Sequence, residues 1–96
     1  MTLDDFKKTI TQAKPPSGLA PAVVALWHDA HGEWEAAHHV AQDIEDASGA
    51  WVHAYLHRKE GDLGNAGYWY RRAGKPQSSV PLEVEWEEIA TALLEG

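Results

Sequence analysis

Residues 60–73 read EGDLGNAGYWYRRA, and they repeat a pattern that first occurs in residues 31–42, HGEWEAAHHVAQ. In both stretches a glycine precedes a polar residue and a large apolar residue, and an alanine follows three positions later. Glycine ends a helix in a conformation that other residues resist. The large residue then anchors the next helix, and the small alanine lets two helices approach closely. This repeat predicts two helical hairpins.

Turn signals divide the chain into six segments whose apolar residues recur at helical spacing, without a long alternating run. The breaks are KPPSG at 14–18, HGE at 31–33, EDASG at 45–49, EGD at 60–62 and GKPQSS at 74–79. The predicted helices are 3–13, the segment from Pro21 to the second break, 33–46, 50–60, 63–73 and 81–95.

These segments predict one all-α domain over residues 1–96. Because the loops inside the middle of the chain are short, the helices there are expected to form antiparallel hairpins at 20–46 and 50–74. Residues 1–18 would form an N-terminal helix with a Pro/Gly linker. Residues 80–96 would form an amphipathic C-terminal helix with an acidic outer side of Glu85, Glu87 and Glu88.

Composition excludes several classes of protein. The chain has 96 residues, a formal net charge of −7 and no cysteine, so disulfide frameworks and thiolate metal sites are excluded. Basic residues are few, which argues against nucleic acid as a principal partner. The N-terminus lacks the apolar region of a signal peptide, and the longest apolar run, 19–27, is too short to cross a membrane. We therefore expect a cytoplasmic protein without a membrane partner.

The segment 20–74 resembles a tetratricopeptide-like helical hairpin pair. Gly32 and Gly61 lie closer together than the repeat of about 34 residues in that family, and DASG at 46–49 stands where a closing proline is usual. The stretch WVHAYLHRKEGD, followed by YWYRRAGKP, also resembles a family of short bacterial proteins of unassigned function. That resemblance implies a small bacterial helical domain and transfers no catalytic residue.

The six histidines raise the question of a metal site. His53 and His57 are one helical turn apart, Glu60 continues the row, and His28 or His38 would complete a ligand shell. The motif HAYLH has Ala54 where a zincin has its glutamate. The alternative is a solvated polar face, because these residues lie opposite the apolar side of segment 50–60.

A second group of residues suggests a binding surface. Arg58 lies near the inward side of its helix, which predicts either an internal salt bridge, for example with Asp62, or a contact with an anion in a groove. Asn65, Tyr68 and Arg72 share the outer side of segment 63–73, and Tyr and Arg are enriched at binding hot spots.

Two functions of different classes follow. The leading one is a non-enzymatic module that holds a peptide, a partner protein or a small anionic ligand between the hairpins, through His57, Arg58, Asn65, Tyr68 and Arg72. The other is a small metal-dependent enzyme that uses a divalent ion at His53, His57 and Glu60. The absence of a nucleophile or phosphate-binding motif argues against an enzyme. A homodimer through the C-terminal helix is left open.

Overall fold

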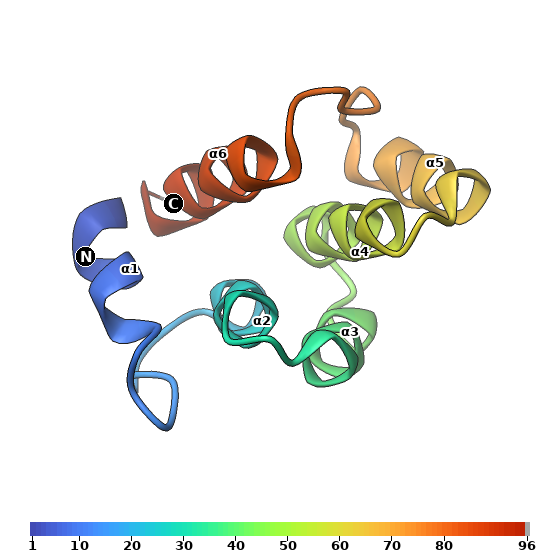
Figure 1. The fold of residues 1–96 in the computed structure, drawn as a ribbon. Coiled ribbons are helices and arrows are strands. Elements are labelled where there is room, and N and C mark those ends of the chain that lie inside the picture. Colours follow the sequence, from blue (N-terminus) through green and yellow to red (C-terminus); the bar gives the residue numbers. More distant parts are fainter. Residues whose placement is uncertain (96) are drawn as a thin grey trace.

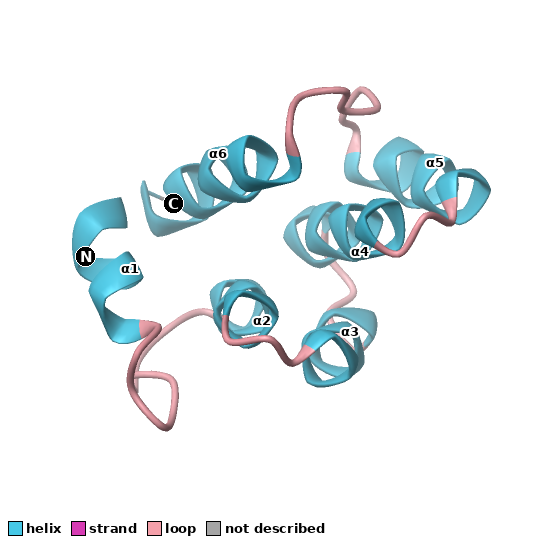
Figure 2. Cartoon of the chain, in the orientation of Figure 1, coloured by secondary structure: helices cyan, strands magenta, loops and turns pink. Residues whose placement is uncertain are grey.

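A computed structural model describes residues 1–95 and contains six helices and no strand within that range (Figure 2). The all-α prediction is confirmed. Gly96, the end of the predicted C-terminal segment, lies outside the described residues. The helices are α1 (Leu3–Thr9), α2 (Pro21–Ala30), α3 (Trp34–Gln42), α4 (Ala47–Lys59), α5 (Leu63–Ala73) and α6 (Leu82–Glu95).

Helix α4 is the centre of the fold. It packs against α2, α3, α5 and α6, whereas α1 contacts α6 so that the two ends of the chain lie near each other (Figure 1). A helix with neighbours on several sides buries more than one apolar stripe. Consecutive residues of α4 from Val52 to His57 are accordingly all buried.

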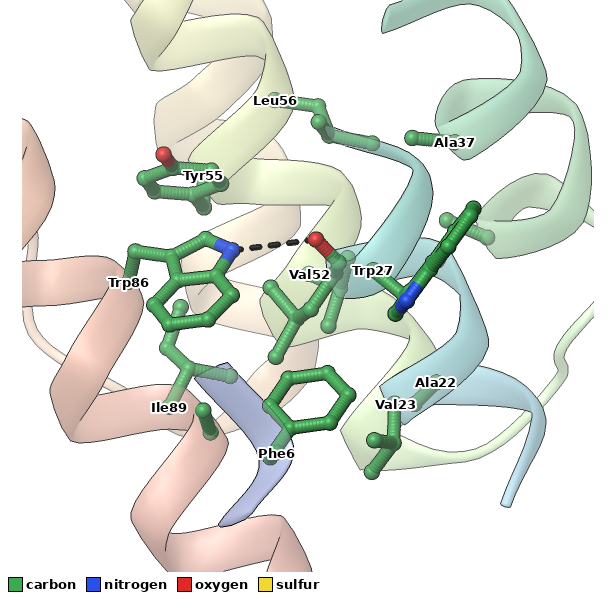
Figure 3. Packing of buried hydrophobic residues seen from close by; sticks show 14 residues of the cluster. Phe6, Ala22, Val23, Trp27, Ala37, Val52, Tyr55, Leu56, Trp86 and Ile89 are labelled. Carbon is green, nitrogen blue, oxygen red and sulfur yellow. Dashed lines mark hydrogen bonds between the residues drawn. The ribbon is translucent and has the colours of Figure 1, made fainter. Parts of the chain in front are cut away.

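Aromatic residues hold the main core between α1, α2, α4 and α6 (Figure 3). Phe6 and Trp86 stack with ring centres 5.6 Å apart. Each buried indole also donates its N–H to a backbone carbonyl on another part of the chain: Trp86 to Leu26 at 3.1 Å and Trp27 to Thr9 at 3.1 Å. These bonds satisfy the polar end of each indole, so the large apolar body is buried without an unpaired donor.

The helix pairs expected as hairpins do pack together, α2 with α3 and α4 with α5. Both connecting turns contain a glycine in the left-handed region, Gly32 at φ 85° and Gly61 at φ 90°, which residues with a Cβ rarely adopt. A tetratricopeptide-like relationship between the pairs stays a prediction.

Three predicted helix boundaries are wrong. Helix α1 ends at Thr9 rather than at residue 13, and α3 ends at Gln42 rather than at residue 46. Helix α4 begins at Ala47 rather than at residue 50, because the carboxylate of Asp46 accepts the backbone N–H of Gly49 at 3.0 Å and caps the helix. The predicted EDASG loop is therefore largely the first turn of α4.

A buried ion pair joins α4 to α6. The guanidinium of Arg58 donates to the Glu85 carboxylate at 2.7 Å, and the Tyr70 hydroxyl donates to the other carboxylate oxygen at 2.5 Å. Arg58 also donates to the backbone carbonyl of Val80. The predicted internal salt bridge thus exists, but its acid is Glu85 and not Asp62.

Glu85 also corrects the sequence analysis, which counted it on the acidic outer side of the last helix. Its side chain is only 2% exposed, because it lies one turn before the buried Ile89 on the inner side of α6.

Within residues 1–95, no helix combines the length and the apolarity that crossing a membrane requires.

A candidate metal centre between α3 and α4

Three histidines from two helices converge beside the centre of the fold. His53 and His57 lie one turn apart on α4 and point to the same side. His38 lies on α3, which packs against that side of α4. One ring nitrogen from each of the three histidines lies within 4.8 Å of the others.

The separations between the rings fit one shared ion. Ring centres are 4.6 Å apart for His38 and His53, 4.7 Å for His53 and His57, and 5.1 Å for His38 and His57. Three imidazoles on one tetrahedral zinc, with Zn–N bonds of about 2.0–2.1 Å, have ring centres about 5 Å apart. The triangle is therefore already close to the size that ligation needs.

Two of these histidines are buried, which corrects the alternative of a solvated face. His53 is 5% exposed and His57 is 7% exposed, because α3 and α5 both pack against α4 and cover the side that the sequence pattern left open. His38 is half-buried, so the cluster reaches the surface at α3.

One hydrogen bond links two of the ring nitrogens. The Nε2 atoms of His38 and His53 lie 2.9 Å apart, which is a hydrogen-bonding distance that requires one proton between them. The other nitrogen of His53, Nδ1, is buried and has no hydrogen-bond partner among residues 1–95. The same is true of Nδ1 of His31, which lies outside the cluster, so an unpartnered nitrogen does not by itself mark a metal site.

His57 has a carboxylate partner. Its Nδ1 lies 2.6 Å from the Oε1 atom of Glu60, which follows on the same side at the end of α4. A carboxylate on Nδ1 holds the proton there and leaves the Nε2 lone pair free. Glu60 and Asp62 also form a second, exposed group of oxygen donors around His57.

The surroundings of His38 and His53 favour their neutral forms. Burial, together with the charges that His38 and His57 would carry, lowers the pKa of His53 to about 4. Burial also lowers the pKa of His38, and His57 adds to that effect. Neutral imidazole is the form that binds metal, so charge on these two rings does not oppose an ion at neutral pH.

Two tryptophans enclose the cluster. Trp34 stacks on His38 with ring centres 5.0 Å apart, and Trp69 stacks on His53 at 4.0 Å. The indole N–H of Trp34 donates to the backbone carbonyl of Leu56 at 2.9 Å, which fixes α3 against α4. The two rings restrict how far His38 and His53 can rotate, so the imidazoles are held before an ion arrives.

The residues predicted as a binding surface lie in two places. His57 belongs to the histidine cluster, and Arg58 is occupied by its ion pair with Glu85. Asn65, Tyr68 and Arg72 are exposed on α5. The guanidinium of Arg72 donates to the Tyr68 hydroxyl at 2.9 Å and lies 5.2 Å from the ring centre of Trp69. The structure therefore does not bring the five residues together.

Sequence reasoning found His53, His57 and Glu60 through their helical spacing, and it left the third histidine undecided between His28 and His38. His28 instead lies beside Glu33, 2.8 Å away. Only the packing of α3 on α4 selects His38, and spacing within one helix contains no signal for it. The short connection between α3 and α4, residues 43–46, was an indirect signal, because helices joined by a short loop usually pack side by side.

Comparisons with known proteins assign this chain to no family. The chain matches no protein-family model, and no curated protein and no solved structure is significantly similar to it.

Proposed function

We propose that this protein is a helical binding module whose ligand is a divalent transition-metal ion, held by His38, His53 and His57. The observation that carries this proposal is the convergence of three imidazole nitrogens within 4.8 Å from two separate helices. Imidazole ligands suit Zn²⁺, Ni²⁺, Cu²⁺ and Co²⁺, whereas Mg²⁺ and Ca²⁺ prefer oxygen ligands.

The existing contacts need little change to accept the ion. Two nitrogens on one tetrahedral zinc lie about 3.3 Å apart, given Zn–N bonds of about 2.0–2.1 Å. The Nε2 atoms of His38 and His53 are 2.9 Å apart, so a metal between them requires a widening of a few tenths of an ångström. The ring that donates the proton of that hydrogen bond would carry it on Nδ1 instead, in the other neutral tautomer. The Glu60 partner on Nδ1 of His57 supports the same assignment, because it leaves Nε2 of that ring free.

The test is calorimetric titration of protein without a histidine tag. Zn²⁺ and Ni²⁺ should bind with one-to-one stoichiometry at neutral pH, and Mg²⁺ should not. His38→Gln should remove binding while the helical circular dichroism is retained, because His38 is half-buried. His39→Gln is the matched control, since His39 is the exposed neighbour of His38 on α3. Equal affinity in both variants would disprove the site.

The flanking tryptophans give an independent readout. Cu²⁺ quenches indole fluorescence at short range, and Trp34 and Trp69 stack directly on two of the ligands. Quenching by stoichiometric Cu²⁺ should disappear in His38→Gln and persist in His39→Gln.

An exposed pair on α5 favours a second function, the binding of a protein or peptide. Tyr68 is 44% exposed and is held by Arg72, and these residue types are enriched at binding hot spots. Because the pair lies outside the histidine cluster, the double change Tyr68→Ala and Arg72→Ala should weaken such a partner without changing metal affinity. A loss of metal affinity in this variant would show that the two surfaces are not separate.

A further inference from the structure

The three histidines supply only three ligands, and the nearest carboxylate is already engaged. Among residues 1–95, no fourth metal-binding side chain has a ligand atom within 4.8 Å of the ring nitrogens of all three histidines, His38, His53 and His57. Glu60 is the nearest acid on the same side of α4, and the sequence pattern predicted it as a ligand. Its Oε1 lies 2.6 Å from Nδ1 of His57.

This contact gives Glu60 a different role. A carboxylate on the Nδ1 proton of a metal-binding histidine orients the ring and raises the basicity of the opposite nitrogen. If His57 binds the ion through Nε2, Glu60 lies on the far side of the imidazole ring from the ion. The same carboxylate oxygen cannot accept the Nδ1 proton and also bind that ion.

We propose that Glu60 is a positioning residue and that the fourth coordination position of the ion is left for a ligand from outside the chain. This inference rests on the proposed metal site. Sites with three protein ligands and one open position are typical of zinc that exchanges water for another ligand, whereas structural zinc sites have four protein ligands.

The chemistry of the site defines the external ligand. Imidazole carries no charge when it binds a metal, so a bound divalent ion would keep its full charge and attract a monodentate anion or a neutral nitrogen donor. The half-buried His38 marks the side where the cluster reaches the surface. Stacking by Trp34 and Trp69 covers other sides of the imidazoles with indole rings, so the approach is limited to small donors such as azide, imidazole or a single carboxylate.

Cobalt provides a direct test, because the visible absorption of Co²⁺ reports its coordination number and its ligands. The Co²⁺-loaded full chain is titrated with azide and, separately, with imidazole. Both should shift the visible spectrum in a saturable way. A spectrum that responds to neither compound would overturn the proposal of an open position, because the protein itself would then supply all four ligands of the ion.

Two variants separate positioning from ligation by Glu60. Glu60→Gln keeps an oxygen that accepts the Nδ1 proton, so its Co²⁺ affinity should stay close to that of the unchanged protein. Glu60→Ala removes the acceptor and should weaken binding about 10- to 100-fold, while the spectrum of the saturated protein and its azide response are retained. A changed spectrum in both variants would show that Glu60 is a ligand and would overturn the inference.

The proposed function and this inference fail in different ways. If Co²⁺ does not bind the unchanged protein at all, the metal site itself is wrong and the inference falls with it. If Co²⁺ binds and His38→Gln abolishes binding, but azide and imidazole have no effect, the metal site stands and only the open position is wrong.

Discussion

His38 and His53 face each other across the contact between α3 and α4, with their Nε2 atoms 2.9 Å apart. This single contact joins the two helices through groups that also bind metals. An ion at this position would replace a hydrogen bond between neutral imidazoles by two coordination bonds. Metal binding and the packing of α3 against α4 are therefore expected to be coupled.

The first prediction follows from this coupling. A ligand that binds only the folded state stabilises it by about 2.7 kcal/mol at a concentration 100 times its Kd. For a domain of this size, 1 kcal/mol corresponds to about 4–8 °C. Saturating Zn²⁺ should therefore raise Tm by about 10–20 °C, measured by circular dichroism with EDTA as the reference.

His38→Gln should lose this thermal shift, and His39→Gln should keep it. An equal shift in both variants would mean that Zn²⁺ stabilises the protein from somewhere else.

The second prediction concerns acid. The pKa of His53 is lowered from its ordinary value of 6.5 to about 4, and burial is the largest cause. Between these two values the unfolded chain binds a proton that the native state does not, so the free energy of unfolding falls as pH decreases from about 6.5 to about 4. His38 acts in the same direction because its pKa is also lowered.

The measurement is urea unfolding with EDTA at several values between pH 7 and pH 4. At roughly 1.4 kcal/mol per pKa unit the full shift corresponds to about 3.5 kcal/mol. Solvent near the edge of the cluster screens part of this, so His53 should account for a loss of about 1–3 kcal/mol. His53→Gln cannot take up the proton, so its stability should decline less steeply over the same range. Parallel curves for the two proteins would contradict the assignment to His53.

How far sequence reasoning reached depends on whether a contact lies within one helix or between helices. His53, His57 and Glu60 form a row because residues three or four apart share a face, and the row was predicted. The burial of this row and the choice of His38 were not predictable, because both result from α3 covering α4. The same limit explains Glu85, whose partner Arg58 lies on another helix.

The third prediction uses that ion pair. Glu85 is buried and also accepts the Tyr70 hydroxyl, so Glu85→Ala leaves Arg58 partly buried without its counter-charge. Removing one partner of a buried pair typically costs about 3–5 kcal/mol. Urea unfolding should show a loss of this order, large beside the total of about 5–15 kcal/mol for a typical protein.

The matched control is the exposed pair of Lys7 and Glu87, whose atoms lie 2.6 Å apart and whose side chains are 45% and 43% exposed. Glu87→Ala should cost less than about 1 kcal/mol, because solvent screens an exposed pair. Similar losses for Glu85→Ala and Glu87→Ala would show that the buried network contributes no more than a surface contact.

The last prediction compares two glycines in the first turns of neighbouring helices. A Cβ added at Gly49 on α4 would lie 2.5 Å from Cβ of Ile44 and 2.6 Å from its backbone oxygen, whereas a Cβ at Gly64 on α5 meets no atom within 4 Å. Neither glycine has a positive φ, so backbone conformation opposes alanine at neither position. Gly64→Ala should stabilise the protein by about 0.4–1 kcal/mol, because alanine has less freedom to lose on folding and a higher helix propensity. Gly49→Ala should instead destabilise it by about 1–3 kcal/mol, since the crowded backbone and side chain of Ile44 must move. Chemical denaturation of both variants measures the difference directly, and a stabilising Gly49→Ala would show that the turn between α3 and α4 is more adaptable than its packing indicates.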